Sequence, residues 1–178
     1  MSLELAESCI EQIPDYPTAG VLFKDVTPIA ANAIAFTSVL AAIAEHYRNH
    51  DITHVVGIEA RGFIFGAALA SHMGVGFIPI RKSGKLPRLT HRVEYALEYG
   101  DDAIEIHQDA LTSTNTVLLI DDVLATGGTA CAALDLINQC GATTVGLAVL
   151  LNLEFLGGFR KVNDLFPACD LFTVFPHA

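Results

Sequence analysis

Two adjacent acids, Asp121 and Asp122, are followed closely by the small-residue loop Ala125-Thr126-Gly127-Gly128-Thr129. Ionised carboxylates accept hydrogen bonds from hydroxyl groups and bind the waters around a divalent cation. The glycines let backbone N–H groups approach an anion closely, and Thr126 and Thr129 add hydroxyl donors with little bulk. This combination predicts a site that binds sugar hydroxyls next to a phosphate group.

The elements around this loop follow the order strand, loop, helix. Val117 to Ile120 is an apolar run that predicts a strand buried on both faces and ending at the acids. From Ala130 to Ile137 apolar residues recur at helical spacing, and Gly141 supplies a stop. The first turn of such a helix offers unpaired N–H groups and the positive end of its dipole, which suits phosphate. The alternative is an ordinary turn in which the acids cap the helix.

Common nucleotide-binding motifs do not describe the loop. No lysine follows the glycines as in a Walker A loop, and no G-x-G-x-x-G follows a strand. The stretch 117–129 instead resembles the motif with which type I phosphoribosyltransferases bind phosphoribosyl pyrophosphate (PRPP). In that motif hydrophobic residues lead into two acids and a T-G-G-T-like loop.

Length and charge limit the classes of function. The chain has 178 residues, of which 52% are hydrophobic, so we expect one globular domain with a sizeable core. The net charge of −10 argues against a general nucleic-acid surface. Five of the ten Lys and Arg residues nevertheless lie between Arg81 and Arg92. This run is either a solvated basic loop or a local counter-charge for a polyanionic substrate.

Cysteines and hydropathy give weaker indications. The four cysteines form no C-x-x-C pair, which favours buried thiols over a zinc or redox site. The N-terminus lacks a basic region followed by an apolar signal core, and no apolar run reaches membrane-spanning length. We therefore expect a cytoplasmic protein with no membrane partner.

Strands and helices alternate along the chain, which predicts an α/β fold with a mostly parallel central sheet flanked by helices. The domain covers 1–178, with an N-terminal arm over about 1–33 and a flexible lid over about 82–99. The expected helices cover 2–13, a segment from Phe36, 63–72 and the segment after Thr129. The expected strands cover 54–58, 75–80, 117–120, 144–151 and an edge strand near 171–175, with a mobile loop over 81–93 and a hairpin of 95–99 with 103–107.

Three further segments resemble one branch of these transferases, the adenine phosphoribosyltransferase family, over nearly the full chain. They are the arm segment 20–25 (Gly-Val-Leu-Phe-Lys-Asp), the loop 59–63 (Glu-Ala-Arg-Gly-Phe) and the run 81–100. The resemblance implies that adenine and PRPP give AMP and pyrophosphate, with Mg²⁺ as cofactor and usually a homodimer. Ala19 where the family often has proline, and a less acidic segment 88–93, are departures that bear on the arm and the lid.

The same resemblance implies roles for individual residues. The 5′-phosphate would lie on Ala125, Thr126, Gly127, Gly128 and Thr129, and the ribose hydroxyls at Asp121 and Asp122, with Mg²⁺ reaching these acids through PRPP and water. Pyrophosphate would meet Ala60, Arg61, Arg81, Lys82 and Lys85, and adenine would stack on Phe23 opposite Leu156, its edge read by backbone groups at Leu22 and Lys24.

Two of the implied residues are catalytic. Departure of pyrophosphate builds positive charge on the sugar in an oxocarbenium-like transition state and negative charge on the leaving group, which Arg61 would stabilise. Glu98 would handle a proton near the imidazole side of adenine. The structural alternatives are a surface carboxylate for Glu98 and an ion pair with Glu59 for Arg61.

Other functions stay open at this level. A related transferase could use guanine or xanthine, since the sequence does not fix the geometry around Phe23. A transcriptional regulator could have kept the fold to sense PRPP, although this acidic chain shows no basic nucleic-acid surface.

Overall fold

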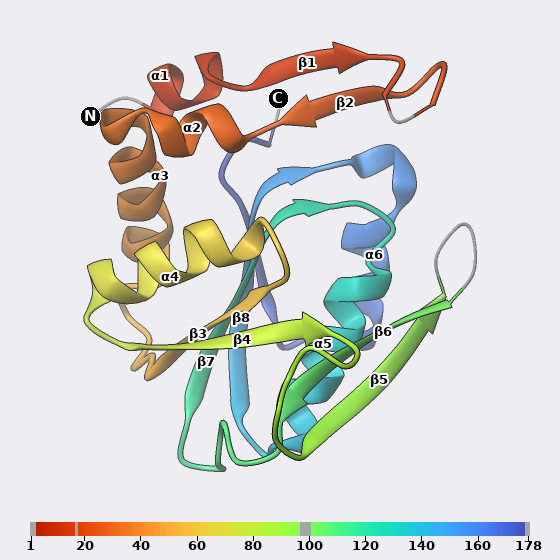
Figure 1. Ribbon diagram of the computed structural model, residues 1–178. Coiled ribbons are helices and arrows are strands. Elements are labelled where there is room, and N and C mark those ends of the chain that lie inside the picture. The colour runs from red at the N-terminus through yellow and green to blue at the C-terminus, as the bar shows by residue number, and fades with distance from the viewer. Residues whose placement is uncertain (1–2, 17, 97–100, 177–178) are drawn as a thin grey trace.

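The computed structural model describes residues 3–16, 18–96 and 101–176, and a sheet of seven strands in the order β5-β6-β4-β3-β7-β8-β9 forms its centre (Figure 1). Strands β3, β4, β7, β8 and β9 run parallel, and β6 and β5 join antiparallel beside β4. The central strands are β3 (His54–Ile58), β4 (Gly76–Lys82), β7 (Thr116–Leu124), β8 (Thr143–Asn152) and β9 (Asp170–Thr173). The hairpin consists of β5 (Thr90–Ala96) and β6 (Asp101–His107).

Helices cover both faces of this sheet. They are α1 (Leu3–Ser8), α2 (Thr27–Ala31), α3 (Ala33–His46), α4 (Gly62–Met73), α5 (Gly128–Gln139) and α6 (Gly158–Leu165), with a short 3₁₀ helix η1 (Glu154–Leu156). This architecture confirms the expected α/β class with a mostly parallel sheet. The edge position of β9 confirms the expected edge strand near the end of the chain.

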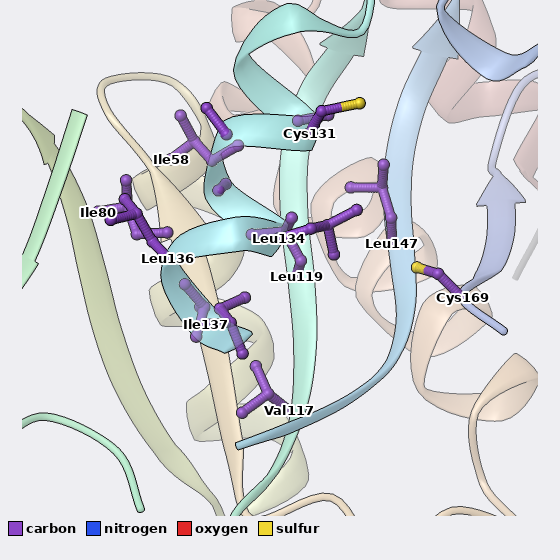
Figure 2. Close-up of a cluster of buried hydrophobic side chains, with 14 of the residues drawn as sticks. Ile58, Ile80, Val117, Leu119, Cys131, Leu134, Leu136, Ile137, Leu147 and Cys169 are labelled. Carbon is purple, nitrogen blue, oxygen red and sulfur yellow. The ribbon is translucent and has the colours of Figure 1, made fainter. Parts of the chain in front are cut away.

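Alternate residues of the central strands build two separate hydrophobic layers. In β7, Leu119 belongs to the layer beneath α5, whereas Leu118 and Ile120 belong to the layer beneath α3 and α4. Figure 2 shows the first layer, where Leu134 and Ile137 of α5 face strand residues. Burial on both faces explains why these strands read as continuous apolar runs.

The N-terminal arm differs from the expectation. A single helix was predicted over 2–13, but α1 ends at Ser8 and Glu11–Pro14 forms β1, which pairs antiparallel with β2 (Leu22–Asp25). The predicted helix was wrong after Ser8 because a pairing with residues further along the chain overrides local helical spacing. The hairpin lies across the end of the sheet where β7 and β8 finish (Figure 1).

The segment predicted as a mobile loop contains more regular structure than its composition indicated. Strand β4 continues through Arg81 and Lys82, and β5 starts at Thr90. The intervening turn is pinned by Glu105, which is 7% exposed and accepts hydrogen bonds from Ser83 Oγ (2.8 Å) and Gly84 N (3.1 Å). The expected hairpin is confirmed, although residues 97–100 lie outside the described residues.

Two other expectations can be compared with the structure. Cys131 and Cys169 are buried and Cys9 and Cys140 partly buried, all four as free thiols. Among the described residues, no helix combines the length and the apolar character needed to cross a membrane.

Candidate active site

Asp121 and Asp122 lie within β7, because the strand continues past them to Leu124. The prediction that the strand ends at the acids was wrong, since β7 stays paired with β8 as far as Leu124 and Asn152. Asp122 is 4% exposed, and its backbone N–H donates to Asp121 Oδ1 at 2.9 Å. Burial, and then the neighbouring charge of Asp122, raise the pKa of the Asp121 carboxyl well above its usual value.

The loop that precedes α4 reaches the same edge of the sheet, as expected for neighbouring parallel strands. A Cβ on Gly62 would lie 2.9 Å from Asp121 Oδ1, so the first residue of α4 touches the acid directly. Arg61 Nε donates to Asp122 Oδ2 in an ion pair. Although burial lowers the pKa of the Arg61 guanidinium, its hydrogen bond to Asp122 and the charges of Asp122, Asp121 and Asp25 together outweigh burial, and the net shift is upward. The structural alternative that paired Arg61 with Glu59 was therefore wrong.

Glu59 pairs with Arg81 instead. Its carboxylate accepts from Arg81 Nη2 (3.0 Å) and Nε (3.2 Å), and also from the backbone N–H of Lys82 (2.9 Å). The bond from Arg81 is the main reason that the pKa of Glu59 is lowered. Arg81 Nη1 also donates to the Lys85 carbonyl oxygen at 3.2 Å. Arg81 thus joins the loop 59–61, called the Ala60 loop below, to the segment 82–89, called the basic turn. Its guanidinium already has carboxylate and carbonyl partners.

The loop 125–129, which is predicted to bind phosphate and is called the phosphate loop below, connects β7 to α5 and includes the first two residues of that helix. Gly127 precedes the helix with φ of 78°, a left-handed backbone that glycine adopts without strain, and no side chain of the described residues caps the first turn. A cavity of about 70 Å³ lies at the loop, lined by Ala125, Thr126, Gly127, Gly128 and Thr129 with neighbouring residues of β7 and β8. The first-turn N–H groups of α5 are therefore available to an anion.

Gly158 at the start of α6 forms the back of this loop. A Cβ there would lie 2.1 Å from the Ala125 carbonyl oxygen and 2.8 Å from the Gly127 nitrogen. The phosphate loop consequently depends on a second glycine that is distant in the sequence.

The arm brings Phe23 to the same region. The Arg61 guanidinium carbon lies 5.7 Å from the Phe23 ring centroid, and Tyr16 meets that ring edge-on at 5.3 Å. Leu22 is 52% exposed, and Lys24 is partly buried. Leu156 is partly buried in η1, which follows β8. The structure therefore places Phe23 next to the acids through Arg61, whereas stacking of a base between Phe23 and Leu156 stays a prediction.

The lysines of the basic turn are exposed. Lys82 Nζ lies 3.2 Å from Asp102 Oδ2, with its side chain 58% exposed, and Lys85 is also exposed. The hydrogen bond and charge of Asp102 raise the pKa of Lys82. Glu98 lies outside the described residues.

Comparisons with known proteins identify the family of this chain. Residues 25–170 match the model of the phosphoribosyl transferase domain family. An adenine phosphoribosyltransferase of Streptomyces clavuligerus is 53% identical over 94% of this chain and 94% of its own. The chain belongs to the adenine phosphoribosyltransferase family.

Solved structures of family members have the same fold. The Saccharomyces cerevisiae enzyme, in complex with adenine and an imino-altritol bisphosphate, has a TM-score of 0.90 at 36% identity, covering 97% of both chains. The Trypanosoma brucei enzyme, in complex with AMP, pyrophosphate and ribose-5-phosphate, has a TM-score of 0.87 at 29% identity, covering 97% of this chain and 78% of its own.

Two residues close to the site, Tyr95 and Asp102, were not predicted from the sequence. Tyr95 of β5 lies opposite Asp102 of β6 and donates to Asp102 Oδ2 at 3.3 Å. Burial raises the pKa of the Tyr95 hydroxyl, and a smaller effect of the Thr129 side chain lowers it. The sequence places Asp102 in the turn of the expected hairpin. Its contact with Tyr95 could be predicted only from the register of that hairpin, which depends on a turn length that the sequence leaves open.

Proposed function

We propose that this chain transfers the 5-phosphoribosyl group of PRPP to adenine, giving AMP and pyrophosphate, as a purine salvage enzyme. The observation that carries the proposal is the joining of three parts at one sheet edge. A small-residue loop at a helix N-terminus adjoins two acids, and Arg61 links those acids to the arm ring of Phe23. These parts match a phosphorylated sugar between an anionic leaving group and a flat acceptor.

The phosphate loop holds the 5′-phosphate in this proposal. The N–H groups of Gly128 and Thr129 at the start of α5 donate to phosphate oxygens, and the Thr126 and Thr129 hydroxyls add further donors. Because β7 pairs with both β3 and β8, the loop starts from a rigid support. The sugar is thereby held at one end while its anomeric carbon reacts.

The acids bind the ribose hydroxyls and hold the sugar in place as its bond to pyrophosphate breaks. Asp122 is held by Arg61, so its oxygens have a fixed orientation, and Asp121 is positioned by the Asp122 N–H. Fixed dipoles and charges of this kind stabilise a charged transition state without reorganising. The transition state in this proposal is oxocarbenium-like.

Pyrophosphate is bound by the Ala60 loop with Arg61, Lys82 and Lys85. In this proposal Arg81 acts mainly by joining that loop to the basic turn, because its guanidinium contacts both Glu59 and the Lys85 carbonyl oxygen. The lysines can reorient toward the leaving group, since the Lys82 side chain is 58% exposed and Lys85 is also exposed.

Mg²⁺ is the proposed cofactor, and it would neutralise part of the pyrophosphate charge when bound. The donor chemistry fits, because carboxylate oxygens suit a hard cation. Asp122 is occupied by Arg61 and the raised pKa of Asp121 weakens it as a ligand, so these acids would meet the ion through PRPP and water. Among the described residues, no group of three or more His, Cys, Asp or Glu side chains is arranged to hold a metal.

Adenine in this proposal stacks on Phe23, where Arg61 now lies 5.7 Å from the ring centroid, with Leu156 on its other face. Backbone groups of Leu22 and Lys24 read the base edge, and Glu98 handles the proton. Closure of the segment 82–99 would exclude water, as in other enzymes with lids.

The assembly of the chain is also a proposal. We propose a homodimer on the strength of the family resemblance, whereas the cytoplasmic location stays a prediction from the sequence. Sedimentation of the purified protein at twice the 19.0 kDa chain mass would test the assembly.

The decisive experiment is a substrate screen. With Mg²⁺ and PRPP, we expect the purified protein to convert adenine to AMP, and the double variant Asp121→Asn with Asp122→Asn to lose this turnover. Asp109→Asn is a matched control, since that carboxylate pairs with Arg88 at the exposed surface. Turnover of hypoxanthine or guanine without adenine would overturn the base assignment. Tight binding of PRPP and DNA without turnover of any purine would favour a regulator.

A further inference from the structure

Polar contacts join the basic-turn residue Lys82 to the β5–β6 hairpin. Lys82 Nζ lies 3.2 Å from Asp102 Oδ2, and the Tyr95 hydroxyl donates to the same oxygen at 3.3 Å. The other carboxylate oxygen of Asp102 accepts from the Ala103 N–H at 2.8 Å. Asp102 therefore joins the Lys82 ammonium to Tyr95 of the neighbouring strand.

The Lys82 ammonium can exchange Asp102 for another anionic partner. The Lys82 side chain is 58% exposed and that of Asp102 is 25% exposed. Ion pairs this close to solvent contribute little, about 0.2–1 kcal/mol. A pyrophosphate group carries several negative charges and can therefore displace Asp102 from the ammonium. Asp102 itself is fixed, because Tyr95 and the Ala103 N–H hold it after Lys82 leaves.

We propose that Asp102 is a positioning residue that holds the Lys82 ammonium in the ligand-free enzyme and takes it back as pyrophosphate departs. The inference rests on the proposed function, in which Lys82 binds pyrophosphate. Asp102 competes with the leaving group for one cation, so it weakens pyrophosphate binding and helps the product to dissociate.

Binding of inorganic pyrophosphate with Mg²⁺, measured by calorimetry, tests the proposal directly. We expect Asp102→Asn to bind pyrophosphate about two- to fivefold more tightly than the wild type, the range that an exposed ion pair allows. The asparagine keeps an acceptor for the Ala103 N–H, so the hairpin should keep its register. The KM for PRPP should fall in the same variant, whereas purely structural damage would raise it.

Two further variants separate the contact from general charge. Glu94→Gln removes one negative charge from the same hairpin, where Glu94 pairs with Arg92 at 3.0 Å, and should leave pyrophosphate affinity unchanged. In a Lys82→Gln background, Asp102→Asn should have no effect, because the competing cation is gone.

The outcomes divide clearly. Unchanged or weaker pyrophosphate binding by Asp102→Asn, at an unchanged melting temperature, overturns the inference and leaves the proposed function intact. A tightening that persists in the Lys82→Gln background, or that Glu94→Gln reproduces, also overturns it. If the wild type itself binds no pyrophosphate with Mg²⁺, the proposed function fails and the inference fails with it.

Discussion

Asp121 is a single residue of the site whose ionisation lowers the stability of the fold. Its carboxyl is confined between Gly62 and the backbone of Asp122, next to a second acid, and its pKa is raised by burial and by that charge. A raised pKa means that the folded state keeps a proton that the unfolded chain releases. Between the ordinary carboxyl value of about 3.9 and the raised value, stability therefore falls as pH increases.

Asp121→Asn should consequently stabilise the fold. The amide oxygen can still accept from the Asp122 N–H, but it needs no charge in a buried place. We expect a higher melting temperature than the wild type at pH 8, with the difference shrinking as pH falls toward 4. Thermal unfolding across this pH range measures it, and a gain that is largest in acid would contradict the raised pKa. Loss of turnover in the same variant would show the usual opposition of stability and activity.

The roles of single residues were predictable where local sequence sets them. The acids and the small-residue loop are contiguous, so their chemistry is visible in one segment of 13 residues. Asp102 and Tyr95 were not predictable, because their contact exists only in one hairpin register. The partner of Arg61 likewise could not be predicted from the residues around it, since Asp122 lies 61 residues away in the sequence.

At the scale of elements, the position of α6 determines the shape of the phosphate loop. Gly158 packs against Ala125 and Gly127 so closely that no side chain fits between them. A change at the start of α6 should therefore reach PRPP binding without touching the ligand.

Gly158→Ala tests this dependence. The new Cβ would meet the Ala125 carbonyl at 2.1 Å, so α6 or the loop must move. We expect a loss of about 1–3 kcal/mol in unfolding free energy, typical of overpacking, and a raised KM for PRPP. Gly74→Ala is the control, since φ of 71° makes alanine strained there although no atom lies within 4 Å of the added carbon. Both variants should lose stability, and an equal KM for PRPP in both would refute the link.

The sequence predicted strands correctly where both faces of the strand are buried. The strands at 54–58 and 144–151 and the helix after the phosphate loop were predicted because their apolar patterns are long and regular. The arm was not, since β1 is exposed throughout and pairs with β2 rather than with the core. The end of β7 was missed because charged residues usually end a buried strand, whereas here β8 pairing carries the strand past them.

At the scale of the whole molecule, the substrate should stabilise the fold by joining parts from distant segments. A ligand at about 100 times its Kd adds roughly 2.7 kcal/mol, which raises the melting temperature of a chain this size by roughly 5 to 10 °C. We expect PRPP with Mg²⁺ to give such a shift and EDTA to reduce it. Ribose 5-phosphate is the matched control, because it lacks pyrophosphate and its smaller shift should not depend on Mg²⁺. An equal shift for PRPP with and without EDTA would argue against the cofactor.

The parallel sheet and its ligand edge were predictable from the alternation of strands and helices, because right-handed crossovers bring successive loops to one edge. The covering of that edge by the arm was not, since β1 and β2 form a separate two-stranded sheet.

The contact between Gly158 and Ala125 also bears on how the protein is made. A growing chain that has reached Gln139 already contains β7, the phosphate loop and α5, yet it lacks β8 and the first turn of α6. The loop backbone is then without its rear support, and its cavity lacks Leu147 and Val149 of β8. The phosphate loop thus gains its rear support only after synthesis has passed Gly158, well after α5 itself is complete.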